Sequence, residues 1–224
     1  MGNGLDHPPP REGQGVNSPG REPGVSMEVL VIPTGAANIA SVMAGLTRAG
    51  AAPRLSEDPG EIRGAGHAVL PGVGAYGAAM ERLGAHGLDR VVADRVRDGR
   101  STLCVCLGMQ LLFERSDESP GVRGLGVVPG TVGRFGGDVR VPQFGWNRVE
   151  PLPTCRLLTP GYAYFANSYR VTGVPEGWRA AYANYDGRFV AAFERGAVLA
   201  CQFHPELSGE WGGQLLRRWL GTEA

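Results

Sequence analysis

The segment from Ser101 to Phe113 constrains the fold of this chain more than any other stretch. A short apolar run, Thr102 to Val105, is typical of a buried strand. Cys106 follows, and after it come Gly108 and the helix-forming residues Met109 to Phe113. A strand, a sharp turn that carries a thiol, and a helix make a nucleophile elbow, which lifts the side chain out of a sheet. Glycine at the turn lets the helix pass close to the strand.

The thiol of Cys106 admits two interpretations. At the start of a helix, unpaired N–H groups and the positive end of the helix dipole favour thiolate over thiol, as a nucleophile requires. A cysteine beside an apolar strand is nevertheless more often a small core residue. The usual elbow also has glycine two residues before the nucleophile, where this chain has Cys104. Cys106 therefore needs a partner base before it can be assigned as a nucleophile.

Strands and helices alternate through the first half of the chain. Asn38 is a candidate N-cap, and the apolar residues after it follow the period of a helix that ends at Gly50. The other expected elements are strands at 28–32, 53–55 and 67–70, a polar glycine-rich connection after the second strand, and helices at about 75–83 and 88–96. Alternation at this spacing predicts an α/β fold around a mostly parallel sheet flanked by helices.

After the elbow the pattern changes to short β-like runs separated by glycine and proline. These runs cover residues 126–128, 131–135, 162–171, 180–185, 189–194 and 198–203. We expect them to extend the sheet with antiparallel or mixed strands. A last helix is expected over 214–220, with its core face formed by Leu215, Leu216, Trp219 and Leu220.

The two ends of the chain differ in composition. Residues 1–26 are rich in glycine, proline and polar residues and have almost nothing apolar to bury, so we expect a disordered tail. Met27 stands directly before the first strand, and a mis-assigned upstream start codon is an alternative to a working tail. We expect residues 27–224 to form a single domain.

Composition argues against several classes of function. Basic and acidic residues number 22 each, and zero net charge argues against nucleic acid or an anionic membrane as the main partner. No apolar run reaches the length of a transmembrane helix. Every basic residue is arginine, which excludes a catalytic lysine. The four cysteines lack the spacing of a disulfide framework, which predicts a reduced, cytoplasmic protein.

A nucleophilic cysteine needs a base that a third group orients. Of the four histidines, His7 lies in the tail, His86 is expected at the surface, and His67 begins a strand at the end away from the site. His204 follows an apolar strand, at the carboxyl end where α/β proteins place their sites. Glu206 is close enough to orient its ring. Elimination alone does not decide between a Cys106–His204–Glu206 triad and purely structural roles for these residues.

Five segments together resemble class I glutamine amidotransferases, and among these the glutaminase subunits of imidazole glycerol phosphate synthase. In chain order they are Leu-Pro-Gly-Val-Gly-Ala-Tyr at 70–76, Cys-Leu-Gly-Met-Gln-Leu-Leu at 106–112, Phe-Gly-Trp-Asn at 144–147, Tyr-Phe-Ala-Asn-Ser-Tyr at 164–169 and Gln-Phe-His-Pro-Glu at 202–206. The second and fifth are shared by the whole class. The other three are more specific to the glutaminase subunit.

The resemblance implies roles for the residues of the elbow and the His-Pro-Glu segment. Cys106 would attack the side-chain amide of glutamine, His204 would move the proton, and Glu206 would fix the tautomer of His204. The oxyanion would be bound by the backbone N–H of Leu107 and by a second N–H from the 71–74 turn, at Val73 or Gly74.

The resemblance also implies residues that bind glutamine and a partner protein. Gln110 and the backbone around Ser168 and Tyr169 would hold glutamine, and Gly72 would leave space for it. No cofactor or metal is expected. Ammonia would pass into a separate (β/α)₈-barrel cyclase subunit, giving a heterodimer. The interface would include Asn38, Trp146 and Asn147.

Several positions depart from the pattern of these subunits. They are Pro33, Cys104, Gln143 and Phe144 in place of a usual His-Met, Asn167 in place of His, and Leu207 in place of Lys or Arg. Most concern the interface or the substrate rim and leave the triad intact. They keep open a paralogous glutaminase that feeds another synthase. A catalytically silent regulatory subunit is a third alternative, which the intact triad residues oppose.

Overall fold

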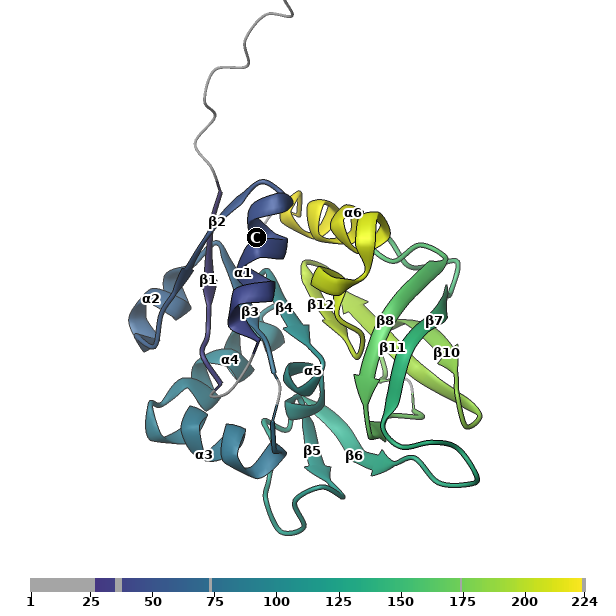
Figure 1. Cartoon of the computed structure of the whole chain (residues 1–224). Helices are drawn as coiled ribbons and strands as arrows, with labels where there is room; N and C mark the ends of the chain where they lie inside the picture. Colours follow the sequence, from purple (N-terminus) through teal and green to yellow (C-terminus); the bar gives the residue numbers. More distant parts are fainter. Residues whose placement is uncertain (1–26, 35–37, 73, 174, 223–224) are drawn as a thin grey trace, which may run out of the picture.

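The computed structural model describes residues 27–34, 38–72, 74–173 and 175–222. The expected disordered tail, 1–26, lies outside the described residues, and so does Val73. The first half alternates as predicted (Figure 1). Its elements are β1 (Met27–Val31), α1 (Ile39–Arg48), β2 (Ala51–Leu55), α2 (Pro59–Gly64), β3 (His67–Leu70), α3 (Tyr76–Ala85), α4 (Leu88–Arg97) and β4 (Thr102–Val105).

The second half is mostly strands. Its elements are α5 (Leu107–Leu111), β5 (Phe113–Ser116), β6 (Val128–Arg134), β7 (Gln143–Pro151), β8 (Gly161–Asn167), β9 (Tyr169–Arg170), β10 (Arg179–Asn184), β11 (Arg188–Arg195), β12 (Val198–Cys201), the 3₁₀ turn η1 (Pro205–Leu207) and α6 (Gly209–Leu220). Asn38 caps α1 as expected, since its side chain accepts from the Ser41 N–H.

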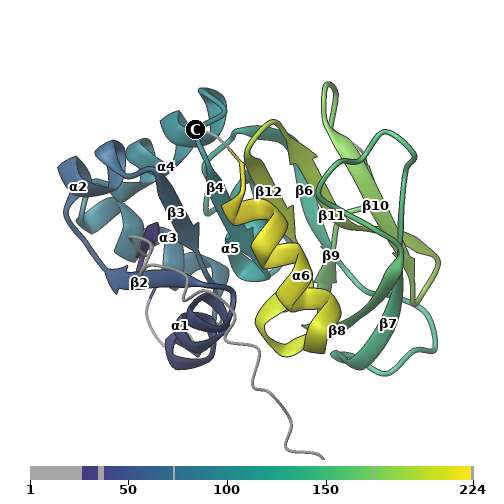
Figure 2. The same cartoon turned by 90° about the horizontal axis from the view of Figure 1, so that it is seen from above.

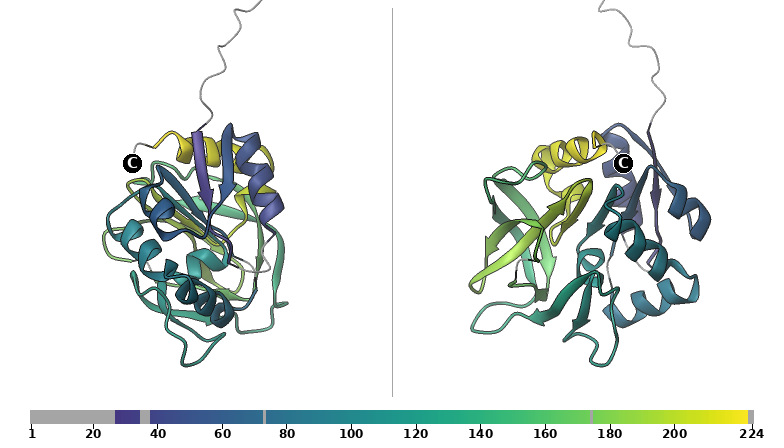
Figure 3. Two further views of the ribbon diagram at one scale, coloured as in Figure 1. Left: turned by 90° about the vertical axis from the view of Figure 1, so that its left-hand side faces the viewer. Right: turned by 180° about the vertical axis from the view of Figure 1, so that it is seen from behind.

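A nine-stranded sheet in the order β2-β1-β3-β4-β12-β11-β10-β7-β8 organises the fold. The first five strands are parallel, and the last four continue the sheet in antiparallel pairing. The predicted parallel sheet with an antiparallel extension is therefore confirmed. Figures 1 and 3 show the antiparallel strands on the side of the molecule opposite to β1 and β2. A small three-stranded sheet, β5-β6-β9, accompanies the main one.

Each face of the sheet has its own hydrophobic core. One core packs helices α2, α3, α4 and α5 against residues such as Leu70, Cys104 and Ala200. The other packs α1 and α6 against the opposite face, around Val105 and Phe203. Figure 2 shows the strands between α1 and α6 on one side and α2 and α4 on the other. Strands buried on both faces explain the continuous apolar runs in the sequence. Within the described ranges, no helix is long and apolar enough to cross a membrane.

Local structure departs from the sequence expectations at four places. The polar connection after β2 contains the short helix α2, whose N-cap Asp58 accepts from the Glu61 N–H at 2.8 Å. Phe113 begins β5, whereas the sequence placed it in the elbow helix. The predicted strand over 162–171 is broken at Ser168, and β7 was not anticipated. The core face of α6 is as predicted, since its four apolar residues are buried.

Candidate active site

Cys106 lies at the sharp turn between β4 and α5. Its φ of 55° and ψ of −110° make it the one non-glycine residue with positive φ in the part of the chain that the structure describes. Such a conformation costs on the order of 1–3 kcal/mol and persists only where the surroundings enforce it. Here the backbone N–H of Cys106 donates to the Cys201 carbonyl at 2.7 Å, which extends the pairing of β4 with β12.

Two glycines allow the elbow to approach β3. A Cβ added at Gly108 would lie 2.1 Å from the Leu70 carbonyl oxygen, so only glycine fits there, as the sequence predicts. A Cβ at Gly72 would lie 2.5 Å from both the Leu107 side chain and the Gly108 nitrogen. Gly72 thus makes room for the elbow backbone, and its expected role in leaving space for glutamine stays a prediction.

The neighbouring thiols have a different environment. Cys104 is fully buried in the core on the α3–α4 side, whereas Cys106 belongs to the core on the α1–α6 side. Burial raises the pKa of the Cys104 thiol to about 12, and the charge of Arg95 offsets this only in part. Burial also raises the pKa of Cys201 well above its ordinary value. Both are therefore poor nucleophiles near neutral pH.

His204 and Glu206 form a buried pair directly after β12. The Nδ1 of His204 lies 2.8 Å from Glu206 Oε1, which leaves Nε2 as the ring nitrogen available to the Cys106 sulfur. Burial lowers the pKa of His204, but its hydrogen bonds with Cys106 and Glu206 outweigh that effect and raise the pKa to about 10. The structure thus brings together the three residues that the sequence singled out.

The segment from His204 to Ser208 is held on several sides. The His204 N–H donates to the Tyr164 carbonyl of β8 at 2.9 Å, and the Ser208 hydroxyl donates to the His204 carbonyl at 2.6 Å. A Cβ on Gly45 of α1 would lie 2.7 Å from the Cβ of Glu206. A Cβ on Gly212 of α6 would lie 2.0 Å from the Pro205 carbonyl oxygen. Both helices therefore pack directly against this segment.

A cavity of about 170 Å³ opens at the sulfur of Cys106. Its lining residues include most of those expected to bind the substrate or the oxyanion, namely Gly74, Leu107, Gln110, Ser168 and Tyr169, together with Glu118, Ala166 and Asn167. Gln110 is buried, so it is not a solvated helix residue. The nucleophile and the candidate binding residues thus converge on this cavity.

Glu118 in this cavity was not anticipated from the sequence. Its Oε2 accepts from the Tyr76 N–H at 3.0 Å, while the Ser119 hydroxyl accepts from Gly77 at 3.1 Å. These contacts supply acceptors for the first N–H groups of α3. The N-cap residue of that helix provides no side-chain acceptor. The polar segment after β5 carried no signal that it folds back across 42 residues onto α3.

One backbone N–H group expected to bind the oxyanion, that of Leu107, already has a hydrogen-bond partner. The Leu107 N–H donates to the Gly72 carbonyl at 3.4 Å, a long hydrogen bond. Gly74 has a φ of 104° and lines the cavity. The N–H of Val73 lies outside the described residues. The Gly72 carbonyl therefore stands where an oxyanion would approach Leu107.

An apolar, partly exposed surface on β7, β8 and η1 lies next to the His204 segment. Phe144 and Trp146 of β7 lie on the same face as Tyr162 and Tyr164 of β8, and Leu207 of η1 is exposed as well. Trp146 and Tyr164 meet edge-on with ring centroids 6.2 Å apart. We refer to Phe144, Trp146, Tyr162, Tyr164 and Leu207 as the aromatic face.

The three residues expected at an interface are placed differently. Trp146 belongs to the aromatic face. Asn38 is exposed at the start of α1 and shares a very small cavity with His204 and Glu206. The Asn147 side chain instead donates to the Asn184 carbonyl of β10 at 2.9 Å. Successive residues of a strand point to opposite faces, so Asn147 does not extend the aromatic face.

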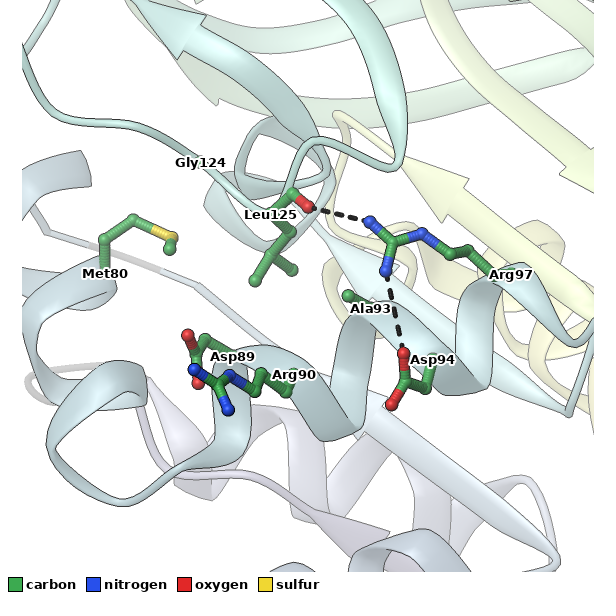
Figure 4. Close-up of a pocket in the computed structure, with 8 residues that line it drawn as sticks. All are labelled: Met80, Asp89, Arg90, Ala93, Asp94, Arg97, Gly124 and Leu125. Carbon is green, nitrogen blue, oxygen red and sulfur yellow. Dashed lines mark hydrogen bonds and ion pairs between the residues drawn. The ribbon is translucent and has the colours of Figure 1, made fainter.

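A larger cavity of about 360 Å³, which Cys106 does not line, lies between α3, α4 and the loop before β6 (Figure 4). Its lining residues are Met80, Asp89, Arg90, Ala93, Asp94, Arg97, Gly124 and Leu125. Arg97 is held there by the Leu125 carbonyl and by Asp94. No thiol or imidazole lines it, so it offers no cysteine nucleophile and no histidine base.

Several known proteins with similar sequences are named as imidazole glycerol phosphate synthases or their subunits. A family model described as glutamine amidotransferase class-I matches residues 51–220. Imidazole glycerol phosphate synthase subunit HisH of Bacillus subtilis is 40% identical over 203 residues, covering 87% of this chain and 96% of that protein. The HisH subunit of Symbiobacterium thermophilum is 39% identical, covering 85% and 92%. The chloroplastic imidazole glycerol phosphate synthase hisHF of Arabidopsis thaliana is 38% identical over 86% of this chain but only 34% of that protein.

Solved structures agree at the level of the fold. A crystal structure described as a glutamine amidotransferase superposes with a TM-score of 0.68 at 22% identity, covering 86% of this chain and 96% of that one. PurLQS from Thermotoga maritima superposes with a TM-score of 0.62 at 14% identity, covering 88% and 98%. Sheet order and helix placement are therefore shared with proteins whose sequences have diverged widely.

Proposed function

The chain belongs to the class I glutamine amidotransferase family, and we propose that it is the glutaminase subunit of an imidazole glycerol phosphate synthase. It hydrolyses glutamine to glutamate and ammonia. It delivers the ammonia to a cyclase subunit, which forms imidazole glycerol phosphate and AICAR in histidine biosynthesis. The observation that carries this proposal is the buried Cys106–His204–Glu206 group, in a chain about 40% identical to HisH subunits over most of its length.

In the proposed reaction, the Cys106 sulfur attacks the side-chain amide carbon of glutamine, and the thiol proton passes to His204. The tetrahedral intermediate collapses when His204 returns that proton to the leaving nitrogen, which departs as ammonia. A thioester remains, and water activated by His204 hydrolyses it to glutamate and the free thiol. Glu206 holds the ring by its Nδ1 and stabilises the positive imidazolium, which the raised pKa of His204 supports.

The oxyanion of each intermediate would be bound by Leu107 N–H and by a second N–H of the turn, at Val73 or Gly74. The Gly72 carbonyl now accepts from Leu107, so the peptide after Gly72 must turn before an oxyanion can enter. Turning that peptide withdraws an oxygen from the hole and presents the next N–H of the chain in its place. We propose that binding of the cyclase partner favours this turn. The isolated chain would then be a poor glutaminase.

The proposed orientation of glutamine follows from the polar groups around the cavity. Its α-ammonium group needs acceptors, which the Glu118 carboxylate and the side-chain amide oxygen (Oε1) of Gln110 can supply. Backbone groups at Ser168 and Tyr169, where β8 breaks, can bind the α-carboxylate. The side-chain amide then extends toward Cys106.

The proposed partner is a (β/α)₈-barrel cyclase that covers Asn38 and the aromatic face. Large exposed aromatic side chains are typical of protein interfaces, and here they lie around the segment that carries His204. The Arabidopsis relative, named hisHF, supports such a partner. The match covers only 34% of that longer protein, so there the matching region is joined to further sequence. We propose a cytoplasmic location on the sequence argument from its cysteines, all four of which are free.

A second candidate is a paralogous glutaminase that supplies ammonia to a different synthase. The exposed Leu207, where the resembling subunits carry a basic residue, favours it because that residue belongs to the aromatic face. Either way the chemistry at Cys106 is the same. Only the acceptor of ammonia differs.

The deciding experiment combines the purified chain with the cyclase encoded in the same genome. We expect glutamine to support formation of imidazole glycerol phosphate, and the Cys106→Ser variant to support it only when ammonium salt is added. Glutamine hydrolysis without transfer to this cyclase would favour the paralogous glutaminase. No hydrolysis in any mixture would contradict a glutaminase.

A further inference from the structure

One buried side chain next to the sulfur has no part in the mechanism above. Gln202 directly follows β12, is 0% exposed, and lies between Cys106 and Gln110. Its Nε2 is 3.5 Å from the Cys106 sulfur, and its Oε1 is 2.8 Å from Gln110 Nε2. A primary amide in an apolar setting is costly to bury unless its polar atoms are paired. Both ends of this amide are paired with residues of the site.

The two contacts determine which way the amide of Gln202 points. An amide oxygen only accepts and an amide nitrogen only donates. With the group turned over, its oxygen would face the sulfur and repel a thiolate, and its nitrogen would face the nitrogen of Gln110. The Gln110 amide would then have to turn as well. A negative sulfur therefore selects the orientation in which Gln202 donates to Cys106 and accepts from Gln110.

The backbone around Gln202 is firmly placed. Its N–H donates to the Ala191 carbonyl at 2.8 Å, and the preceding carbonyl, of Cys201, accepts from Cys106 N–H at 2.7 Å. The side chain therefore leaves the strand beside the elbow, one residue before Phe203 and two before His204. The same short segment carries the base and an amide donor to the nucleophile.

We propose that Gln202 is a further residue of the catalytic site, which stabilises the Cys106 thiolate through its N–H and fixes the amide of Gln110 for glutamine binding. The second role rests on the proposed glutaminase function. Gln110 directs its Nε2 to Gln202, so its Oε1, on the other branch of the amide, is left for an N–H of the substrate. One side chain thereby links the nucleophile to the residue that recognises glutamine.

Two substitutions separate these roles. Gln202→Met keeps a similar volume but removes both hydrogen bonds. Gln202→Glu keeps an acceptor for Gln110 but places a carboxylate against the sulfur. The first readout is alkylation of Cys106 by iodoacetamide across about pH 5 to 10, followed by peptide mapping. The second is the KM for glutamine of the complex with the cyclase.

We expect Gln202→Met to slow alkylation at neutral pH by about tenfold, because a hydrogen bond to a charged group is lost. Its KM should rise by about the same factor. Gln202→Glu should slow alkylation more, with the pH profile displaced to higher pH by like-charge repulsion, while KM stays within about threefold. Wild-type alkylation rates and KM in both folded variants would overturn the proposal. A chain without glutaminase activity whose variants still slow alkylation would contradict the proposed function and support the Gln202 contact.

A measurement on the unaltered chain covers the case in which the variants fail to fold. The side-chain amide protons of Gln202 should shift in NMR spectra with the same pH midpoint as alkylation, and this shift should vanish in Cys106→Ser. Gln214, exposed on α6, serves as the internal control and should not follow that midpoint. An unresponsive Gln202 amide would overturn the proposal.

Discussion

Two segments meet at Cys106 from opposite sides, and they are held very differently. The His204–Ser208 segment is bonded to β8, packed under Gly45 and Gly212, and joined to α1 by Arg48, which donates to the Glu206 carbonyl at 3.1 Å. The described part of the 71–74 turn is bonded by the Thr34 hydroxyl to Pro71 at 3.0 Å and by the long Leu107–Gly72 contact. No described atom lies within 4 Å of the position that a Cβ on Gly74 would take.

This difference separates two parts of the catalytic machinery. His204 and Glu206, the proposed base and its orienting carboxylate, are already paired in the chain by itself, so the proposed proton transfer needs no rearrangement. In the proposed reaction the oxyanion donors depend on the 71–74 turn, whose Gly72 carbonyl accepts from the Leu107 N–H. We propose that a switch in this turn silences the enzyme without disturbing the triad, so that ammonia is released only when a partner is present to use it.

The largest effect is expected when the nucleophile beside the firmly held His204 segment is removed. Cys106→Ser should reduce glutamine hydrolysis by on the order of 10⁴-fold or more, because the nucleophile is lost. Cys104→Gly should keep it, since that thiol lies in the opposite core. Labelling with a glutamine-analogue electrophile and peptide mapping checks both. Label on Cys104 would contradict the assignment.

The next prediction concerns the carboxylate of the fixed segment. Glu206→Gln should lower hydrolysis by on the order of 10²-fold or more, since the imidazolium loses its charged partner. The folded-state pKa of His204, about 10, lies above its unfolded value, so its contribution to stability is fully present below about pH 6.5. That contribution is lost as the pH rises through 10. Denaturant melts of both proteins should therefore differ most near pH 6 and converge by about pH 10. A difference that grew with pH would contradict the assigned shift.

A matched pair of glycine substitutions tests the two segments against each other. Gly45→Ala forces its Cβ against Glu206, which should cost about 1–3 kcal/mol in the free energy of unfolding and slow alkylation of Cys106. Gly74→Ala meets no steric obstacle but strains a positive φ, at a cost of about 1–2 kcal/mol. It should leave alkylation unchanged and reduce the activation by the partner. Equal loss of alkylation in both variants would remove the distinction.

The smallest effect is expected at the N-terminus. Deletion of residues 1–26 should leave activity and the melting temperature unchanged, because that sequence has almost no apolar residues to bury. A melting temperature several degrees lower after the deletion would show that the segment contributes to the fold.

The sequence predicted best what depends on local apolar runs. Strands 67–70 and 102–105 were placed at their observed limits because both are continuous, fully buried runs bounded by polar residues or turns. The sequence did not predict helix α2, because its six residues bury only Ile62 and so show no helical period of apolar residues. Its Asp-Pro start was nevertheless a usable cap signal.

Around the active site, the limits of the sequence are contacts between distant parts of the chain. The triad followed from strand ends and from resemblance. Glu118 reaches the cavity by bonding α3, and Gln202 reaches Cys106 across 96 residues. The close approach of Gly72 to the elbow could not be predicted either, because it depends on packing between distant segments. A lone amide beside an apolar strand was the one local signal for Gln202.

The most direct test of a fixed triad with a switched oxyanion site is glutamine turnover by the purified chain, alone and with the cyclase and its nucleotide ligand. Cys106 alkylation is measured in the same two states. Losing one oxyanion donor costs on the order of 10²–10³ in rate, so the account predicts a gain of that size in turnover with little change in alkylation. Equal turnover in both states would contradict the switch.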